Sequence, residues 1–501
     1  MTALPQPADA KWLRADTDNF IIYSEGSEKS LREFSELLQR FDATLRTRFG
    51  IGSGLEPNRL TIFLLPRSTD VHKLSPRTLG PSIAGFYSPS LEGTYAVSNR
   101  ESHTVKGTSQ AQQTLFHEYT HHFMRRYLSA AFPAWFVEGF AEYYSTTDYT
   151  KTGQAKIGMP AYARAYGLLN LPKVPAETLL FQRPGAMRNS GQMDVYYGRA
   201  WLLTHMLYYH PGRSGQLATY MEALNKGDDS KKAAADAFGD LAELDKDLNR
   251  YMTKPMSYRL TATPIPISGS ITIRALSPAE DAVLPLHLRR KAAQDDEQRS
   301  KIRDDLRKLS ATHSTDASIW FETAAVEWDM DEDVRDLAAV RTALDRTLAI
   351  EPKHVHANVL LSRLLIKELD DKGGTDAAAW NAARKPVILA NRTDPNSPWP
   401  LYIYFTSFLA QGIEPPAIAF DGLARAFDIA RESPSVRILQ IQALADQKKF
   451  DQAIELAKVL AFDPHDNGSG EALLDQIEQM RAMAKKTARA KAAASAEAES
   501  E

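Results

Sequence analysis

The stretch that organises this chain is residues 114–144, which read TLFHEYTHHFMRRYLSAAFPAWFVEGFAEYY. It predicts two helices joined by a turn around Pro133, because proline suits the first turn of a new helix. His117 and His121 are four residues apart, so on a helix they lie on the same face, where two imidazoles can reach one metal ion. Glu118 lies between them and is expected to point at the open side of that ion.

The second helix offers a third ligand. Zinc in a catalytic site takes three protein ligands and leaves a fourth position for water, and two His plus one Glu is a known set. Glu138 is therefore the candidate third ligand. Glu142 lies one turn beyond Glu138 and is either the acceptor for the other ring N–H of His117 or His121, or a solvated surface residue. His122 is about 100° round the helix from His121, so it does not share the ion.

These residues resemble the gluzincin metallopeptidases, in which H-E-x-x-H is followed on a second helix by a ligand Glu. The phrase E-G-F-A at 138–141 is similar to the N-E-G-F-A of the aminopeptidase N and leukotriene A4 hydrolase family. The shorter gap from His121 to Glu138 fits better with the bacterial peptidase MA-like domains, which share W-x-x-E-G-x-A-E-Y. The resemblance implies that His117, His121 and Glu138 bind zinc and that Glu118 is the general base.

A further segment bears on the stabilisation of a tetrahedral oxyanion. Residues 195–203 read VYYGRAWLL and resemble the Tyr-x-Lys-Gly segment of the aminopeptidase family, where the Tyr donates to that oxyanion. The resemblance gives this role to Tyr197, with its neighbour Tyr196 as the alternative, and Arg199 stands where that family has Lys. The other interpretation is that both Tyr are core residues with wet hydroxyls. The G-x-M-E-N phrase that binds a free amine in aminopeptidases is missing, which favours an endopeptidase.

The amino-acid composition of the chain excludes some classes of function. The chain has 501 residues, no Cys and a net charge of -3, so thiolate chemistry is excluded and no general attraction to nucleic acid is expected. Nothing reaches the 18 or so consecutive apolar residues of a membrane span. The first ten residues have no basic start and no apolar core, so no signal peptide is visible. The compartment stays open: periplasmic if a signal was removed, otherwise cytoplasmic.

From about residue 278 onward the sequence is typical of helices and is weakly repetitive. Pro352, Pro395, Pro434 and Pro464 end four similar phrases and are separated by 43, 39 and 30 residues, which brackets the roughly 34-residue tetratricopeptide period. The irregular spacing leaves a plain helical bundle as the alternative. We expect five segments: an N-terminal α/β sheet subdomain (1–110), a helical zinc-binding subdomain (111–252), a linker (253–277), tetratricopeptide-like repeats (278–480) and a disordered or frayed tail (481–501).

The expected fold class is therefore α+β: a mixed sheet plus a helical zincin catalytic domain, followed by an all-α tetratricopeptide-like solenoid. The expected function is that of a zinc-dependent metallopeptidase, most simply an endopeptidase, with Zn²⁺ as cofactor and a peptide or protein as substrate. The alternative is a catalytically silent metal-binding scaffold that acts through its helical repeats. In either case the repeats offer a surface for a protein partner.

Overall fold

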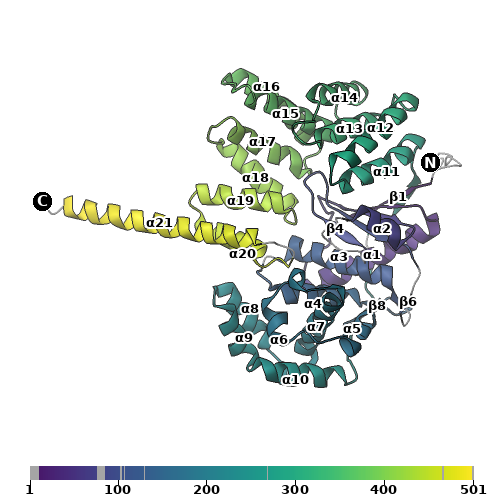
Figure 1. Cartoon of the computed structure of the whole chain (residues 1–501), viewed down its shortest axis with the longest axis vertical. Coiled ribbons are helices and arrows are strands. Elements are labelled where there is room, and N and C mark those ends of the chain that lie inside the picture. The colour runs from purple at the N-terminus through teal and green to yellow at the C-terminus, as the bar shows by residue number, and fades with distance from the viewer. Residues whose placement is uncertain are drawn as a thin grey trace. The chain divides into compact units, whose positions relative to one another are not determined.

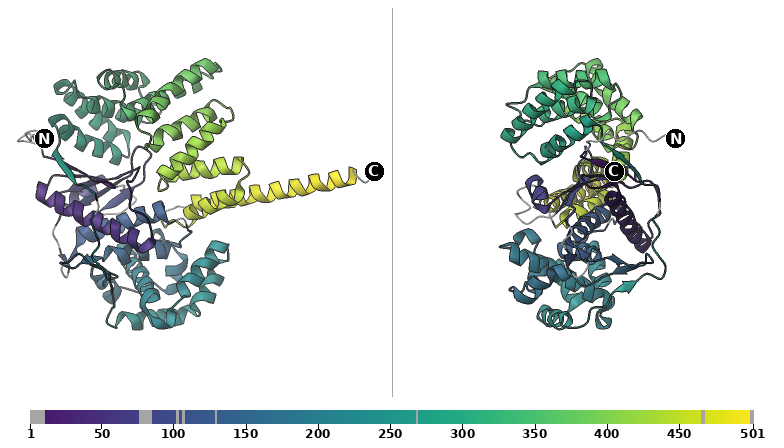
Figure 2. Two further views of the ribbon diagram at one scale, coloured as in Figure 1. Left: turned by 180° about the vertical axis from the view of Figure 1, so that it is seen from behind. Right: turned by 90° about the vertical axis from the view of Figure 1, so that its right-hand side faces the viewer.

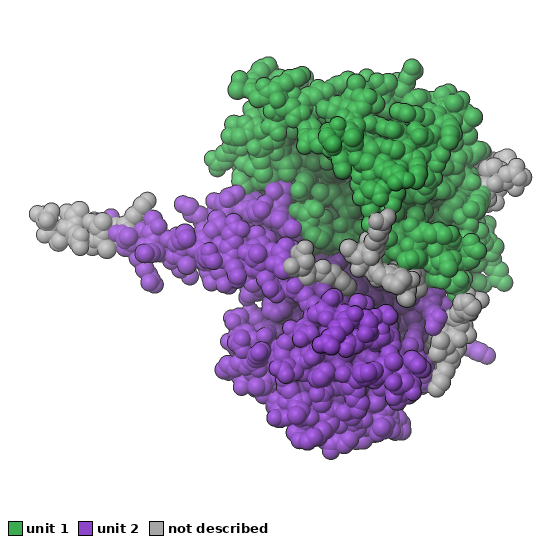
Figure 3. Space-filling view, in the orientation of Figure 1, with its two compact units in different colours: residues 1–40, 52–101, 267–436 green, residues 41–51, 102–266, 437–501 purple. Residues whose placement is uncertain are grey.

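The computed structural model describes residues 11–75, 85–101, 104–105, 108–128, 130–267, 269–464 and 468–498, without the side chains of 104, 105, 108, 491–494 and 496–498. The chain divides into two compact units, coloured differently in Figure 3. Unit 1 comprises residues 1–40, 52–101 and 267–436, and unit 2 comprises residues 41–51, 102–266 and 437–501. Each unit is assembled from segments far apart in the sequence.

Unit 1 contains a mixed sheet of six strands in the order β11-β1-β2-β3-β5-β4. The strands are β1 (Leu13–Asp16), β2 (Phe20–Ser24), β3 (Leu60–Leu65), β4 (Phe86–Ser88), β5 (Tyr95–Asn99) and β11 (Thr272–Ala275). β2, β3 and β5 pair in parallel, and the other pairs are antiparallel. Helix α1 (Glu28–Phe49) connects β2 to its parallel neighbour β3.

The sheet forms where the sequence is richest in apolar residues. β3 reads LTIFLL and is buried at every position except Thr61, as expected for a central parallel strand covered on both faces. Helix α1 carries Leu31, Leu38, Phe41 and Leu45 at helical spacing, and all four are buried. The boundary between the units falls after Arg40, so the first two belong to unit 1 and the last two to unit 2. The short helix α2 (Ser68–Leu74) contributes buried Val71 to unit 1.

Successive helix pairs make up the rest of unit 1. The helices are α11 (Pro278–Ala292), α12 (Asp296–Thr312), α13 (Ala317–Trp328), α14 (Leu337–Ile350), α15 (Val355–Asp370), α16 (Ala377–Thr393), α17 (Pro398–Ala410) and α18 (Ala417–Ile429). Within the array α13 packs on α14, α15 on α16 and α17 on α18, and neighbouring pairs lie side by side (Figure 1, Figure 2). Their cores are apolar, as in the cluster of Trp328, Leu344 and Leu360. The chain is thus α+β with a small mixed sheet and a helical repeat region.

Unit 2 is mainly helical. Its elements are β6 (Thr104–Val105), β7 (Thr108–Ser109), α3 (Gln110–Tyr127), α4 (Ala134–Ser145), β8 (Asp148–Tyr149), β9 (Ala155–Ile157), α5 (Ala165–Asn170), α6 (Ala176–Phe181), α7 (Ser190–Tyr209), α8 (Gln216–Lys226), α9 (Ser230–Phe238), α10 (Leu241–Met252), β10 (Arg259–Leu260), α20 (Phe450–Ala461) and α21 (Ser469–Ala498). Helix α19 (Pro434–Asp446) crosses the boundary between the units. Over the described ranges, no helix is both long and apolar enough to span a membrane.

The units cut across the segment boundaries expected from the sequence. The expected linker 253–277 supplies β10, which pairs with β9, and β11, which pairs with β1. Strand pairing with residues far away in the sequence therefore orders parts of this segment. Helices after residue 278 are divided between the units, and α21 continues unbroken past residue 480.

Candidate metal centre

The predicted pair of helices around the H-E-x-x-H motif is confirmed as α3 and α4. Ser109 caps α3, with its hydroxyl accepting a hydrogen bond from the backbone N–H of Gln112 at 3.4 Å. Helix α4 begins directly after Pro133, as expected from the preference of proline for helix starts. Helix α4 packs on both α3 and α7, so it carries Glu138 between them.

A glycine allows the close approach of α4 and α7. A Cβ atom added at Gly139 would lie 2.3 Å from Oγ1 of Thr204 and 2.4 Å from the carbonyl oxygen of Ala200. No side chain fits at that spacing, so the residue after Glu138 has to be glycine. The backbone contact therefore fixes where the Glu138 side chain leaves its helix.

We expect Gly139→Ala to lower the free energy of unfolding by about 1–3 kcal/mol, because the added methyl group forces α4 away from α7. The same shift moves Glu138 and should weaken zinc binding. Gly185→Ala is the matched control, since a Cβ there meets no atom within 4 Å. Chemical denaturation and zinc titration of both variants measure the two effects. Equal stability of the two variants would contradict the close-packing argument.

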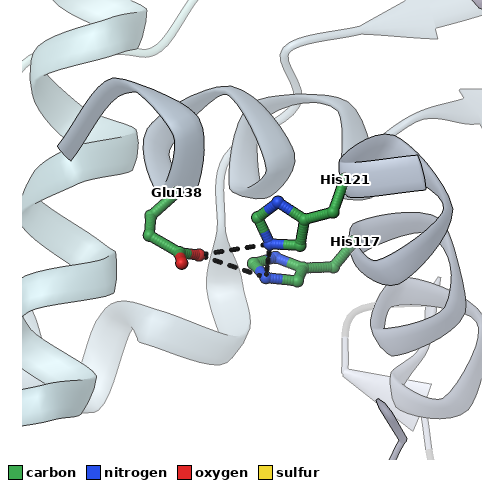
Figure 4. A group of neighbouring side chains, drawn as sticks. All are labelled: His117, His121 and Glu138. Atoms are coloured by element: carbon green, nitrogen blue, oxygen red, sulfur yellow. Dashed lines mark hydrogen bonds and ion pairs between the residues drawn. The ribbon is translucent and has the colours of Figure 1, made fainter. Parts of the chain in front are cut away.

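Three polar atoms from α3 and α4 converge (Figure 4). Nε2 of His117 and Nε2 of His121 each lie 3.4 Å from Oε2 of Glu138, and the two nitrogens are 3.0 Å apart. The Glu138 side chain is 0% exposed, His121 is 6% exposed and His117 is 15% exposed. A carboxylate so deeply buried requires a positive partner.

The three residues fit a zinc ion. Zinc binds His nitrogen at about 2.0–2.1 Å and carboxylate oxygen at about 2.0–2.2 Å, so ligands of a tetrahedral ion lie about 3.3 Å from one another. The three observed separations are close to that spacing. Two imidazoles and one carboxylate are also the ligand types that zinc prefers when no thiolate is present.

Glu142 contacts Nδ1 of His117, the ring nitrogen that does not face Glu138. Its Oε1 lies 3.2 Å from Nδ1 of His117, so a proton on Nδ1 leaves the lone pair of Nε2 free to bind a metal. Arg164 in turn contacts both carboxylate oxygens of Glu142, at 2.6 Å and 3.2 Å. Burial opposes ionisation of Glu142, but Arg164 and His117 outweigh it and lower the pKa of Glu142 to about 2.

The pKa values of the two imidazoles are shifted in opposite directions. Burial lowers the pKa of His117, but the carboxylates of Glu138 and Glu142 outweigh it and raise the pKa to about 10. For His121, burial dominates over the negative charges of Glu138 and Glu118, and its pKa falls below the ordinary value.

Glu118 and Tyr197 are less deeply buried than Glu138. Both side chains are only partly buried, whereas the neighbouring Tyr196 is fully buried. The Tyr197 ring is edge-on to the His117 ring, with centroids 6.1 Å apart. Burial, reinforced by the charge of Glu138, raises the pKa of Tyr197 well above its ordinary value, so its hydroxyl remains a proton donor at neutral pH.

The structure distinguishes the two neighbouring tyrosines. The Tyr196 hydroxyl donates to the backbone carbonyl of Gln182 at 2.9 Å, which anchors it away from the His residues. The Tyr197 ring instead faces His117 and lies under the guanidinium of Arg164, 5.1 Å from its centroid. Of the two rings, that of Tyr197 lies beside the three candidate ligands.

A second group of potential ligands lies in unit 1. Atoms of Glu92, His287 and Glu322 lie within 4.8 Å of one another. Arg290 contacts Glu92 and Glu322, at 2.5 Å and 2.8 Å, and Lys291 also contacts Glu92. Since these cations already neutralise both carboxylates, the group is an ion-pair network and not a metal centre.

The comparisons with known proteins do not place the chain in a family. No protein-family model matches it, and no curated protein matches it. Among solved structures, a crystal structure of yeast Tom70 aligns over 73% of this chain and 69% of that chain, with 11% identity and a TM-score of 0.27. That similarity is too low to support an argument about fold or function.

These findings overturn the resemblance to the gluzincin metallopeptidases. No model of any protein family matches the chain, those of peptidases included, and no curated protein matches it. The assignment to the peptidase MA-like domains, and through them to the aminopeptidase N family, is therefore wrong. It depended on two short phrases that cover little more than two helices, and two helices can converge on a metal ion in unrelated folds.

One important residue was missed by the sequence analysis. Arg164 lies in the Gly- and Pro-rich segment between β9 and α5, where no motif marks it. Its contact with Glu142 is formed only by the fold, because the two residues are on different elements. An arginine that belongs to no motif carries no signal of this kind in the sequence.

Proposed function

We propose that the protein is a zinc-dependent metallopeptidase that hydrolyses peptide bonds within a chain. One observation carries the proposal: the convergence of Nε2 of His117, Nε2 of His121 and Oε2 of Glu138 at 3.0–3.4 Å from one another. These three side chains would hold the ion. A bound zinc ion supplies a Lewis acid that polarises a carbonyl and lowers the pKa of water to about 7.

Glu118 is the proposed general base. It takes a proton from the attacking water and passes it to the amine nitrogen as the carbon–nitrogen bond breaks. Its position supports this role, because it lies one residue after His117 and its charge acts on both His121 and Tyr197. Tyr197 donates its hydroxyl proton in a hydrogen bond to the oxyanion that develops from the substrate carbonyl.

We expect Tyr197→Phe to lower kcat by about 10²–10³-fold with little change in KM, since the lost hydrogen bond forms mainly in the transition state. Tyr196→Phe is the matched control. Its hydroxyl bonds a backbone carbonyl, so its loss should affect stability more than turnover. Steady-state kinetics on a fluorogenic peptide measure both variants. An unchanged kcat in Tyr197→Phe would remove this residue from the mechanism.

The proposal as a whole is tested by metal content and proteolysis. Purified protein should contain close to one zinc ion per chain by mass spectrometry, and it should cleave a mixed peptide library. Removal of zinc with a chelator should abolish cleavage, and added zinc should restore it. A protein that cleaves equally well without metal would refute the proposed chemistry.

A second candidate function is that of a metal-binding scaffold without catalytic activity, which binds a protein partner through the helix pairs of unit 1. The series α13 to α18 favours it, because stacked helix pairs offer extended surfaces for protein binding. The same measurements separate the two candidates. One zinc ion per chain without any cleavage would favour the scaffold.

A further inference from the structure

Arg164 contacts three side chains around the metal centre, all in unit 2. Its guanidinium bonds both oxygens of Glu142 and also donates through Nη1 to Oδ1 of Asp194 at 2.7 Å. The central carbon of the same guanidinium lies over the Tyr197 ring, 5.1 Å from the ring centroid. Only arginine can make a two-pronged carboxylate contact and stack on an aromatic ring at once.

Asp194 secures Arg164 from a different helix. It lies near the start of α7, whereas Glu142 lies on α4 and Arg164 directly precedes α5. A Cβ at Gly167 would lie 2.2 Å from Oδ2 of Asp194, so α5 carries a glycine where this carboxylate approaches it. The guanidinium is thereby held between carboxylates from two helices.

The consequence for the metal centre follows through Glu142. Its carboxylate faces Nδ1 of His117, and a carboxylate there keeps the ring proton on Nδ1 and the metal-binding lone pair on Nε2. Without Arg164, the Glu142 carboxylate would lose the two contacts that hold it in place and would be free to rotate away from His117. His117 would then lose the partner that fixes its tautomer and its orientation.

We propose that Arg164 is the positioning residue of the metal centre: it holds Glu142 against Nδ1 of His117 and holds the Tyr197 ring beside it. This inference rests on the proposed zinc site and names a residue outside the predicted set. Arg164 is not in contact with the three metal-binding atoms and acts through Glu142. Its loss should therefore appear in zinc affinity even when no substrate is present.

The experiment measures zinc affinity by competition with a chromogenic chelator, on the full chain and without substrate. We expect Arg164→Ala to weaken zinc binding by about 10–100-fold, the usual effect of removing a residue that orients a ligand. Arg164→Lys should restore part of the affinity, because one ammonium keeps the charge but cannot bond both oxygens. Arg188→Ala, an exposed arginine of the same unit, should leave the affinity unchanged.

A double-mutant cycle tests whether Arg164 acts through Glu142. If it does, Arg164→Ala should cost little further zinc affinity once Glu142→Ala is present. Full additivity of the two losses would overturn the inference, as would unchanged affinity in Arg164→Ala. Circular dichroism verifies folding, and Arg164→Lys replaces Arg164→Ala in the cycle if the alanine variant is unfolded.

The failure of this inference is distinguishable from the failure of the proposed function. Wild-type protein that binds no zinc would contradict the proposed function and, with it, this inference. Wild-type protein that binds zinc while every Arg164 variant binds it equally well would contradict only the positioning role. Steady-state kinetics provide a further measurement. Arg164→Ala no longer holds the Tyr197 ring in place, so its kcat should be lower than that of wild type even when both are saturated with zinc.

Discussion

Glu118→Gln should retain one zinc ion per chain and lose nearly all peptide hydrolysis. Glutamine keeps the shape of the side chain but cannot accept the proton of the attacking water, so kcat should fall by about 10²–10⁴-fold. Zinc stays because the three proposed ligands are His117, His121 and Glu138, and none of them is changed. Metal content by mass spectrometry and kinetics on a fluorogenic peptide measure the two properties on one sample.

Two controls make this result specific. Glu177→Gln removes an equal charge from an exposed position on α6 of the same unit and should change neither property. His117→Ala should lose both zinc and activity, because it removes a ligand. Normal cleavage by Glu118→Gln would show that another group is the base, whereas loss of zinc from it would place Glu118 among the ligands.

Arg290→Ala should destabilise unit 1 by about 3–5 kcal/mol, the usual cost of leaving buried carboxylates without their cation. The Arg290 side chain is 3% exposed and contacts three acidic residues. Its nitrogens lie 2.5 Å from Glu92, 2.8 Å from Glu322 and 2.8 Å from Asp329. Urea unfolding followed by circular dichroism measures the loss in the transition of unit 1.

The neighbouring arginine provides the matched control. Arg289 is exposed and pairs with Asp305 at the surface, so Arg289→Ala should cost at most about 1 kcal/mol. Losses of equal size in the two variants would contradict the buried network.

The loss of stability in Arg290→Ala should depend on pH. Burial opposes ionisation of Glu322, but Arg290 and His287 outweigh it and hold its pKa at about 2. A carboxyl whose pKa is depressed by folding stabilises the native state above the ordinary glutamate range and loses that contribution as pH falls toward 2. The stability difference between wild type and Arg290→Ala should therefore shrink as pH falls below about 4.

The ion-pair network also bears on the scaffold alternative. The connection between β4 and β5 places Leu91 against the cluster that contains Val359 and Trp399, and places Glu92 against Arg290. Part of the helical array is thus already bound by a segment of its own chain. A protein partner would use the remaining surface of the helix pairs, so the helices serve the fold of unit 1 whatever else they bind.

The sequence by itself determined the local features of the candidate metal centre. Two His at a spacing of four, and Glu138 with Glu142 at the same spacing, predict shared helical faces because an α-helix repeats every 3.6 residues. The start of α4 directly after Pro133 was predictable as well, because it depends on neighbouring residues only. The short motif did not determine the family, since two helices with these spacings can occur in unrelated folds.

Only the tertiary structure decided which residues from distant segments meet. It brought Arg164 to Glu142, turned Tyr197 rather than Tyr196 toward His117, and paired β11 with β1 at the edge of the sheet. These contacts depend on how whole elements pack, and packing depends on the shape and burial of all their side chains together. A local pattern carries no such information, because the free energy that selects these contacts is gained only when the complete core is assembled.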